Sequence, residues 1–267
     1  MRKKLYLSGI LCCVFVCLTY MVPIKVHKVQ AEVYAAGRAE CVMEWETGQV
    51  LHEKSANLPL PMASTTKILT AITVLEGCTN LAEVISIPQE AVGIEGSSVY
   101  LQSGGKYSVQ DLLYGLMLRS GNDCAVALAL HFGGSISNFC AKMNVIAQKA
   151  GALNSHFENP HGLPCENHYT TARDLCYITR YALKNKTFSD IVATKSYDER
   201  NWKNKNKFLN LFDGVLGVKT GYTKEAGRCL VSAARRNGRT LICTVLNCGP
   251  MYERSAELLN KAFASYE

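Results

Sequence analysis

The chain has 267 residues, of which 48% are hydrophobic, and a formal net charge of +7 at neutral pH. This length and composition provide enough apolar surface for a substantial core. Residues 1–31 contain five of the 29 Lys and Arg residues and no acid, which leaves a formal charge of only +2 on the remainder. That balance gives no electrostatic basis for nucleic-acid binding, and we expect no nucleic-acid partner.

The N-terminus has the pattern of an export signal. Arg2, Lys3 and Lys4 precede an uncharged stretch over residues 5–22, which matches the basic and apolar regions of a signal peptide. Cleavage after Ala31 or Ala35 would remove it, whereas its 18 uncharged residues also approach the length of a membrane span. We therefore predict that residues 1–31 are a signal peptide or a retained N-terminal membrane anchor, and that any membrane contact is made there. The rest of the chain is expected outside the cytoplasmic membrane, secreted or attached to its outer face.

A predicted β-hairpin over residues 40–55 is followed by the first chemically informative segment. Apolar residues recur at helical spacing over residues 65–76, just after Pro61, so we expect a helix there. Its start reads STTK from Ser64 to Lys67, an S-x-x-K pattern. Residues three apart share a helix face, so the Lys67 amine can reach the Ser64 hydroxyl and act as the base that a serine nucleophile needs. In the first turn, the unpaired N–H of Ser64 can also point at a developing oxyanion.

The sequence SGGK at residues 103–106 fits the same pattern. Its two glycines disfavour a helix and favour a turn, so the serine and lysine side chains are not expected to share a face. We therefore predict that Ser64 is the nucleophile and that Ser103 is not.

The tripeptide SGN, Ser120 to Asn122, follows a predicted helix. Ser108 and Asp111 form a capping-box pattern before an apolar stripe, and the tripeptide comes where this helix ends. A tight connection between buried helices would hold the Ser120 and Asn122 side chains rigidly. Alone, the tripeptide is a weak signal, because Ser, Gly and Asn also form ordinary turns.

The middle of the chain reads as a mainly helical lobe over about residues 78–200, inserted between segments that form a sheet. Later helices of this lobe are predicted at 136–150 and 172–184, the second begun by a Thr171 capping box, and the polar residues 201–210 read as an exposed loop. Strands are then expected near 215–222, 229–235 and 239–247, with an Asn237-Gly238 turn between the last two, and a final helix at 252–264.

The tripeptide Lys219-Thr220-Gly221 lies in the first of these strands. A lysine ammonium beside a threonine hydroxyl can hold a carboxylate, and a glycine lets a substrate backbone approach the strand closely. In isolation, the tripeptide would be an ordinary exposed strand edge. The three patterns S-x-x-K, S-x-N and K-T-G in this order indicate an acyl-transfer site with a nucleophile and its base, a proton relay and an anion clamp.

Longer segments carry a family likeness in the same order: PMASTTKILTAI, SSVYLQSGGKYSVQDLLYGLMLRSGNDCAVALA, HFENPHGL, HYTTARDL and GVKTGYTKEAGRCLV. Over about residues 33–264 the chain therefore resembles the serine-type D-alanyl-D-alanine carboxypeptidases, which are low-molecular-mass penicillin-binding proteins. The resemblance implies the α/β fold of the β-lactamase and transpeptidase superfamily, with an antiparallel sheet flanked by helices, a mainly helical lobe, and the active site between them. It also implies a single penicillin-binding domain over residues 33–267, without the C-terminal β domain of some members.

The implied activity is removal of the terminal D-alanine from peptidoglycan stem pentapeptides through an acyl-enzyme, without a cofactor. β-Lactam antibiotics would acylate the same serine as covalent inhibitors. Lys67 would act as the base of Ser64, which needs a lysine pKa well below the ordinary value of about 10.4. The N–H groups of Ser64 and Tyr222 would form the oxyanion hole. The catalytic residues implied by the resemblance are Ser64, Lys67, Ser120 and Asn122, and the substrate-binding residues are Lys219, Thr220, Gly221 and Tyr222.

Three alternatives share parts of this pattern. A transpeptidase would act on the same substrates, and a catalytically silent module would bind β-lactams or cell wall without needing Lys67 as a base. A class A β-lactamase would carry a deacylating Glu with an Asn four residues later, but Glu158 and Glu166 are followed at that distance by a glycine and a threonine. We therefore expect no fast β-lactam hydrolysis. Separately, we prefer Lys67 as the activator of the hydrolytic water, and interpret His161 as a loop-bracing residue.

Twelve cysteines are an unusual number for an exported protein. Three lie in the apolar leader, and the other nine lie mostly in apolar runs and cannot all pair. We expect them to be mainly reduced core thiols. No C-x-x-C occurs, and the histidines at 156, 161 and 168 form no compact ligand pattern, so we expect no metal site.

Overall fold

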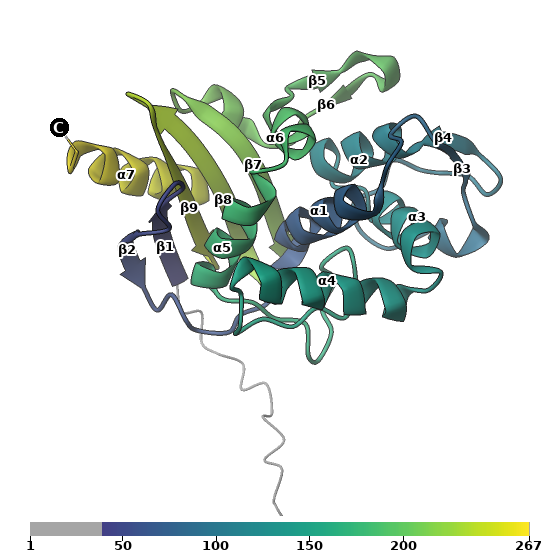
Figure 1. The fold of residues 1–267 in the computed structure, drawn as a ribbon, viewed down its shortest axis with the longest axis horizontal. Helices are drawn as coiled ribbons and strands as arrows, with labels where there is room; N and C mark the ends of the chain where they lie inside the picture. The colour runs from purple at the N-terminus through teal and green to yellow at the C-terminus, as the bar shows by residue number, and fades with distance from the viewer. Residues whose placement is uncertain (1–38, 267) are drawn as a thin grey trace, which may run out of the picture. The chain divides into compact units, whose positions relative to one another are not determined.

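The computed structural model describes residues 39–266, so the predicted export signal or anchor lies outside the described residues. Five strands form one antiparallel sheet in the order β2-β1-β9-β8-β7, which makes β2 and β7 its edges (Figure 1). The strands are β1 (Ala39–Glu44), β2 (Val50–Lys54), β7 (Val215–Thr223), β8 (Gly227–Arg236) and β9 (Arg239–Leu246). The beginning and the end of the described chain thus build the sheet together.

Turn chemistry explains the hairpins of this sheet. Asn237 and Gly238 join β8 to β9 with φ angles of +47° and +78°, the left-handed pair that a tight two-residue turn requires. Strands β1 and β2 pair antiparallel, with Glu40 opposite Lys54. Both hairpins predicted from the sequence are therefore confirmed.

Helices cover both faces of the sheet. Helix α7 (Met251–Ala264) shares a buried cluster with Leu230 and Cys243, whereas the neighbouring strand residues Val231 and Ile242 face the larger core on the opposite side. On that second face, α5 (Ala172–Ala182) packs against β1 and β9, and α6 (Lys186–Ala193) packs against the edge strand β7 (Figure 1). These two helices belong to the segment expected as a helical lobe over residues 78–200. They pack against the sheet because each has a one-sided apolar pattern.

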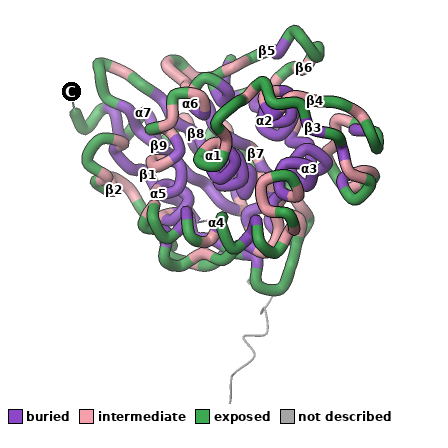
Figure 2. Tube along the Cα trace, turned by 45° about the vertical axis from the view of Figure 1, so that its right-hand side comes forward, coloured by how far each residue is buried: buried purple, intermediate pink, exposed green. Residues whose placement is uncertain are grey.

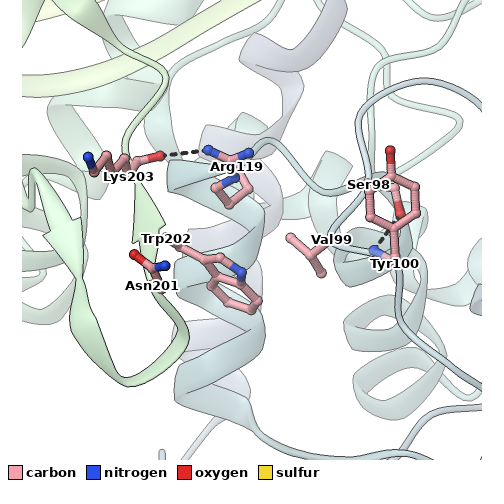
Figure 3. Close-up of a pocket in the computed structure, with 7 residues that line it drawn as sticks. All are labelled: Ser98, Val99, Tyr100, Arg119, Asn201, Trp202 and Lys203. Atoms are coloured by element: carbon pink, nitrogen blue, oxygen red, sulfur yellow. Dashed lines mark hydrogen bonds between the residues drawn. The ribbon is translucent and has the colours of Figure 1, made fainter.

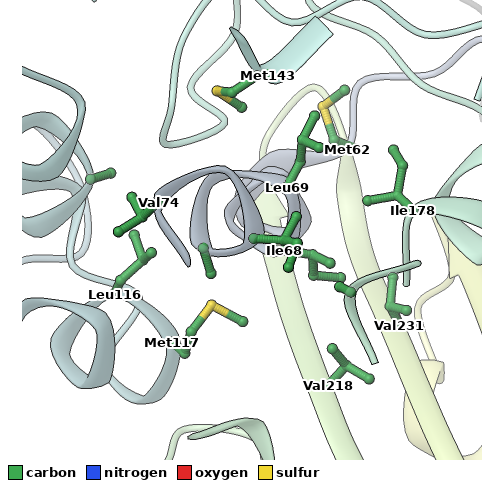
Figure 4. Packing of buried hydrophobic residues seen from close by; sticks show 14 of the residues in the cluster. Met62, Ile68, Leu69, Val74, Leu116, Met117, Met143, Ile178, Val218 and Val231 are labelled. Atoms are coloured by element: carbon green, nitrogen blue, oxygen red, sulfur yellow. The ribbon is translucent and has the colours of Figure 1, made fainter. Parts of the chain in front are cut away.

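Helix α1 (Lys67–Gly77) is the central helix of the larger core. All residues from Lys67 to Val74 are buried, and Figure 2 shows this helix enclosed by the surrounding elements. Around it lie α2 (Val109–Leu118), α3 (Asn122–Gly133) and α4 (Ile136–Ala150), together with α5 and α6. Its side chains Ile68, Leu69 and Val74 lie among Leu116, Met117, Met143, Ile178, Val218 and Val231 from these helices and the sheet (Figure 4). The first two turns of this helix are buried on every side, which gives Lys67 a fixed position and little water.

Short elements connect these layers. The SGGK sequence at residues 103–106 forms a turn, with Gly104 at φ +76°, before a short strand, so its predicted non-helical conformation is confirmed. The short strands are β3 (Val84–Ser86), β4 (Lys106–Ser108), β5 (Ser196–Tyr197) and β6 (Trp202–Lys203). The 3₁₀ turns are η1 (Ala63–Thr66), η2 (Gln89–Ala91), η3 (Asp198–Arg200) and η4 (Lys207–Asn210).

Two local predictions need correction. Residues 201–210 are not simply an exposed loop, because β6 and η4 occupy them and Phe208 is buried beneath α7 with Val42 and Leu230. The Lys- and Asn-rich composition concealed this apolar anchor. Thr171 caps α5 as predicted, by accepting a hydrogen bond from the N–H of Asp174 at 3.0 Å. The reciprocal half of the box is missing, since the Asp174 carboxylate accepts from the N–H of Asn154 at 2.7 Å instead.

Within residues 39–266, no single helix combines the length and the apolar composition needed to cross a membrane, and α3 with α4 meets those criteria only as a pair bent by 88°. The same residues contain no group of three or more His, Cys, Asp or Glu side chains placed to hold a metal ion. Of the nine cysteines beyond the leader, seven are buried.

Candidate active site

The structure brings Ser64 and Lys67 together at the start of the central helix. Ser64 lies in the 3₁₀ turn η1, and α1 begins at Lys67 itself, so the predicted first helical turn is tighter than an α-turn. The Lys67 Nζ lies within hydrogen-bond distance of Ser64 Oγ, at 2.9 Å. Ala63, just before the serine, has φ +49°, a left-handed conformation that turns the chain sharply into the helix.

Lys67 is fully buried and held by three oxygen atoms. Its Nζ lies within hydrogen-bond distance of Ser64 Oγ at 2.9 Å, of Asn122 Oδ1 at 2.7 Å and of the carbonyl oxygen of His161 at 2.6 Å. None of the three acceptors carries a formal charge. Burial, and next the positive charge of Lys219, hold the pKa of Lys67 well below its usual range. As a neutral amine, Lys67 donates its two N–H groups to Asn122 Oδ1 and the carbonyl of His161. Its lone pair then faces the Ser64 hydroxyl, which is the property that a base requires.

Lys219 extends from the edge strand β7 into the same site. Its Nζ donates to Ser120 Oγ at 3.1 Å and to the carbonyl oxygen of Thr220 at 2.9 Å. Burial, and next the charge of Lys205, lower the pKa of Lys219 to about 7. The K-T-G strand therefore places the Lys219 ammonium, which has a lowered pKa, beside the S-G-N turn. An incoming carboxylate would be an electrostatically favourable partner for it there.

The S-G-N turn connects α2 to α3, as the sequence predicted. Ser120 has φ +63° and Asn122 is the first residue of α3. Both polar atoms of the Asn122 side chain are hydrogen-bonded, which fixes the orientation of the amide. Oδ1 accepts from Lys67, and Nδ2 donates to the carbonyl of Glu95 at 2.5 Å. The N–H of Asn122 donates to the carbonyl of Ser97 at 2.7 Å. Asn122 thus links the base to the segment of residues 95–97.

Gly221 is where the edge strand touches the nucleophile turn. A Cβ at this position would lie 2.9 Å from the carbonyl oxygen of Met62 and 3.1 Å from the backbone nitrogen of Ser64. Only a glycine lets β7 approach η1 so closely. The next residue, Tyr222, is 64% exposed, and its predicted contact with the oxyanion uses its backbone N–H.

The loop of residues 158–168, which holds the predicted bracing residue His161, contributes a main-chain oxygen to Lys67. Asn159 Oδ1 accepts from the N–H of Gly162 at 2.7 Å, and Gly162 has φ +92°. A Cβ on Gly162 would collide with the carbonyl of Ala63 at 1.9 Å. Burial, and next the charge of Lys67, lower the pKa of His161 to about 3, so its ring is neutral near pH 7. Its carbonyl contact to the lysine was not predicted, because main-chain contacts leave no side-chain signal.

A buried histidine ties this loop to the nucleophile turn. The N–H of Glu158 donates to His168 Nδ1 at 3.0 Å, which leaves the ring proton on Nε2. That nitrogen donates to Thr66 Oγ1 at 3.0 Å, and Thr66 donates to the carbonyl of Ala63 at 2.9 Å. Glu166 is exposed, and the Glu158 carboxylate accepts from the N–H of Asn167 at 3.2 Å. The oxygen that this loop places next to Lys67 is thus the main-chain carbonyl of His161. A class A β-lactamase would need a glutamate carboxylate near this position.

Asp123, which sequence reasoning also missed, organises the wall beside Asn122. Its carboxylate accepts from Ser98 Oγ at 2.6 Å, from the N–H of Val99 at 3.0 Å and from the N–H of Leu101 at 3.0 Å. The side chain is almost fully buried. A buried carboxylate with three donors is a strong local constraint, so the segment of residues 98–101 is held firmly against α3.

Comparisons with known proteins identify relatives of this chain. The sequence profile of the peptidase S11 family, D-alanyl-D-alanine carboxypeptidase, matches residues 25–249. The D-alanyl-D-alanine carboxypeptidase DacF of Bacillus subtilis is 33% identical over 251 residues, which cover 89% of this chain and 64% of the relative. The D-alanyl-D-alanine carboxypeptidase of Streptomyces sp. strain K15 is 37% identical over 244 residues, which cover 82% of this chain and 84% of the relative. The chain thus spans less than two thirds of the Bacillus relative and most of the Streptomyces one.

Solved structures show the same fold. The Streptomyces K15 DD-transpeptidase superimposes with a TM-score of 0.79 at 38% identity, covering 86% of this chain and 97% of that chain. The D-alanyl-D-alanine carboxypeptidase of Mycobacterium tuberculosis H37Rv gives a TM-score of 0.79 at 32% identity, covering 85% and 90%. The predicted α/β fold of the β-lactamase and transpeptidase superfamily, with an antiparallel sheet and flanking helices, is confirmed. The chain belongs to the D-alanyl-D-alanine carboxypeptidase family of serine peptidases.

Proposed function

We propose that this protein is a serine D-Ala-D-Ala carboxypeptidase that removes the terminal D-alanine from peptidoglycan stem pentapeptides. The observation that carries the proposal is the fully buried Lys67 amine, 2.9 Å from Ser64 Oγ and with a pKa held well below its usual range. Binding alone needs no such base. Family membership supports the same activity.

Acylation uses the three motifs together. Ser64 Oγ attacks the carbonyl carbon of the penultimate D-alanine while its proton moves to neutral Lys67. The N–H groups of Ser64 and Tyr222 stabilise the oxyanion of the tetrahedral intermediate. As the C–N bond breaks, Ser120 passes a proton to the leaving amine of D-alanine. Asn122 hydrogen-bonds the peptide of the substrate.

Carboxylate binding and deacylation complete the cycle. Lys219 and Thr220 hold the terminal carboxylate of the substrate, and Gly221 leaves room for its backbone along β7. Lys67 then activates water, which attacks the ester carbonyl and returns Ser64 to its free form. β-Lactams acylate Ser64 by the same first step. The protein acts outside the cytoplasmic membrane, on the cell wall, and residues 1–31 provide its export signal or its anchor.

Release of D-alanine from a diacyl-D-Ala-D-Ala peptide tests the proposal. We expect Ser64→Ala to lower the turnover rate by about 10³-fold or more, as removal of a serine nucleophile does elsewhere. The chain offers a matched control in Ser103→Ala, which changes the serine of the second S-x-x-K sequence and should leave turnover unchanged. Equal turnover in Ser64→Ala and wild type would refute the proposal. Labelling by a fluorescent penicillin without any D-alanine release would instead identify a silent β-lactam-binding module.

A second candidate activity is transpeptidation on the same substrates. It is favoured by the Streptomyces K15 relative, which is called a carboxypeptidase in one comparison and a DD-transpeptidase in the other. The two activities share the acyl-enzyme and differ only in whether water or an amine attacks it. The measured product with an added amine acceptor therefore distinguishes them.

A further inference from the structure

The groups that hold Ser64 and Lys67 in position lie inside the molecule. The cavity of about 370 Å³ between the β5–β6 hairpin and residues 98–100 is lined by seven residues (Figure 3), and within residues 39–266 no hydrogen bond joins any of them to Ser64 or Lys67. His168, in contrast, is 5% exposed and lies between the loop of residues 158–168 and the nucleophile turn η1. The proposed mechanism assigns it no task.

The surroundings of His168 fix which ring nitrogen carries the proton. Burial lowers the pKa of His168 to about 4, so near pH 7 the ring is neutral and has one donor and one acceptor. The N–H of Glu158 donates to Nδ1 at 3.0 Å, which makes Nδ1 the acceptor and Nε2 the donor. Phe157 packs almost perpendicular to the ring, with a centroid distance of 5.7 Å. The ring therefore has one tautomer and one orientation.

The donor nitrogen begins a chain of hydrogen bonds that ends next to the nucleophile. Nε2 donates to Thr66 Oγ1 at 3.0 Å, and the Thr66 hydroxyl donates to the carbonyl of Ala63 at 2.9 Å. Ala63 directly precedes Ser64 and has φ +49°, a left-handed conformation that an alanine keeps where its surroundings hold it. Thr66 directly precedes Lys67 and is fully buried. His168 thus braces the backbone on both sides of Ser64.

The acceptor nitrogen holds the ends of the loop that contacts Lys67. Glu158 and His168 are the first and last residues of that loop, so their hydrogen bond closes it. From this loop, the main-chain carbonyl of His161 lies 2.6 Å from Lys67 Nζ. Bonding the two ends of a loop restricts its conformations, which keeps this carbonyl against the base. One ring therefore connects the turn that carries the nucleophile with the loop that positions its base.

We propose that His168 is a positioning residue of the acyl-transfer site, which keeps the Ser64 hydroxyl aligned with Lys67. It acts through Thr66 and the main chain of Glu158, and its hydrogen bonds reach no reacting atom. Of the two links, the one to Thr66 is the more important for acylation, because it leads to the turn that carries the attacking hydroxyl. This inference rests on the proposed serine acyl-enzyme chemistry and adds a residue to it.

Three substitutions separate the two links from the space that the ring fills. Glutamine places its Nε2 donor the same number of bonds from Cα as the histidine Nε2, so His168→Gln can keep the hydrogen bond to Thr66. Asparagine places its Oδ1 acceptor the same number of bonds from Cα as Nδ1, so His168→Asn can keep the hydrogen bond from Glu158. His168→Met occupies a similar volume and keeps neither.

The rate constant for acylation of Ser64 by a fluorescent penicillin tests this role. We expect His168→Asn and His168→Met to lower it by about tenfold or more, since a 1 Å displacement near a reacting group costs about 100-fold, and His168→Gln to stay close to wild type. The dissociation constant of the preceding non-covalent complex should change little, because the carboxylate-binding strand β7 lies outside this network. His131→Asn, on α3 and with its own acidic partner, is the matched control and should acylate at the wild-type rate.

A double-mutant cycle shows whether the effect passes through Thr66. Thr66→Val keeps the shape of the side chain and removes its hydroxyl, so it should slow acylation about as much as His168→Met does. The double variant should be no slower than the slower single variant, because both changes break the same chain of hydrogen bonds. Effects that multiply in the double variant would contradict this route.

Each rate constant is measured on the fraction of protein that the penicillin finally labels, so a misfolded portion of a variant does not enter it. Equal rate constants in His168→Gln and His168→Met would overturn the proposal, because filling the space would then be the whole contribution of the ring. A wild-type rate constant in His168→Asn would overturn it as well. Wild-type labelling without D-alanine release would instead overturn the carboxypeptidase proposal and leave the role of His168 in acylation intact. Absence of labelling in wild type would overturn both.

Discussion

At the scale of single residues, the site depends on two buried lysines with different tasks. Lys67 must be neutral to take a proton, and Lys219 must be charged to hold a carboxylate. Three uncharged oxygens surround the Lys67 amine, so no carboxylate offsets its burial. Lys219 lies nearer to its protonated form near neutral pH, with a pKa of about 7. The positive charge of Lys219 favours the neutral form of Lys67.

The pH profile follows from these two pKa values. We expect kcat/KM for a D-Ala-D-Ala peptide to fall as pH rises through about 7, because Lys219 then loses the charge that binds the carboxylate. On the acidic side, kcat/KM falls once Lys67 is protonated, at a pH well below the usual lysine range. In Lys219→Arg the alkaline fall should disappear from the measured range, because a guanidinium stays charged. An alkaline fall at the same pH in this variant would assign it to another group.

Lys205 provides a finer control for the same profile. Its charge is the second cause of the lowered pKa of Lys219, after burial. Lys205→Gln should therefore move the alkaline fall of kcat/KM to higher pH without abolishing it. A shift to lower pH would contradict this electrostatic account.

At the scale of elements, catalysis requires the edge strand β7 to touch the turn η1. Gly221 makes that contact possible, since a Cβ there would meet main-chain atoms of Met62 and Ser64 at 2.9 and 3.1 Å. Main-chain atoms cannot rotate away as a flexible side chain can. A side chain at this position would therefore separate the anion clamp from the nucleophile.

We expect Gly221→Ala to slow acylation by a fluorescent penicillin about 100-fold, because a displacement near 1 Å at a reacting centre has costs of that order. Gly249→Ala is the matched control, since nothing lies within 4 Å of a Cβ there, and its acylation rate should equal that of wild type. Thermal unfolding of both variants shows whether they are folded. Unimpaired acylation in a folded Gly221→Ala would mean that the strand need not approach so closely.

Helix α7 is fixed to the sheet by a buried ion pair. Arg254 donates to both carboxylate oxygens of Glu40 on β1, at 2.9 and 2.8 Å, and the Glu40 side chain is fully buried. Glu40→Ala leaves the Arg254 charge poorly compensated, so we expect the free energy of unfolding in urea to fall by about 3 kcal/mol. Glu257, the exposed second partner of Arg254, gives the control: Glu257→Ala should cost less than about 1 kcal/mol. Equal losses in the two variants would argue against a special role for the buried pair.

At the scale of the whole molecule, many thiols are enclosed in the two cores. Burial raises the pKa of Cys140 to about 11 and that of Cys229 to about 12. It raises the pKa of Cys124 and of Cys243 as well. In the unfolded chain such thiols ionise near their ordinary pKa of about 8.5. These thiols therefore make their full contribution to the free energy of unfolding below about pH 8.5. They lose it as the pH rises toward their pKa values in the folded state.

We expect the free energy of unfolding to decrease between pH 8 and pH 10, measured by urea denaturation in reductant. Each of these four thiols lowers it by up to about 1.4 kcal/mol per pH unit once the unfolded thiol is ionised. Lys67 and Lys219 act in the opposite direction over this range, because their folded pKa values are lowered, but two lysines only partly offset four thiols. Constant or rising stability up to pH 10 would contradict this balance.

Local sequence patterns alone determined much of this protein. Apolar spacing located α1, the Ser108 capping box and the apolar stripe after it located α2, and Asn237-Gly238 located the last hairpin. These signals are local because helix periods, caps and tight turns depend on neighbouring residues. The order of the three motifs, with the longer likeness around them, was sufficient to indicate the fold and the side chains of the site.

Only the tertiary structure decided how these side chains are held. The carbonyls of His161 and Glu95 position Lys67 and Asn122, and Asp123 fixes the wall beside them, through contacts between segments far apart in the chain. Main-chain acceptors carry no residue-specific signal, and the burial of Phe208 within a polar stretch depends on a partner helix. The packing of distant segments, which no local pattern encodes, removed water from Lys67 and thereby set its pKa.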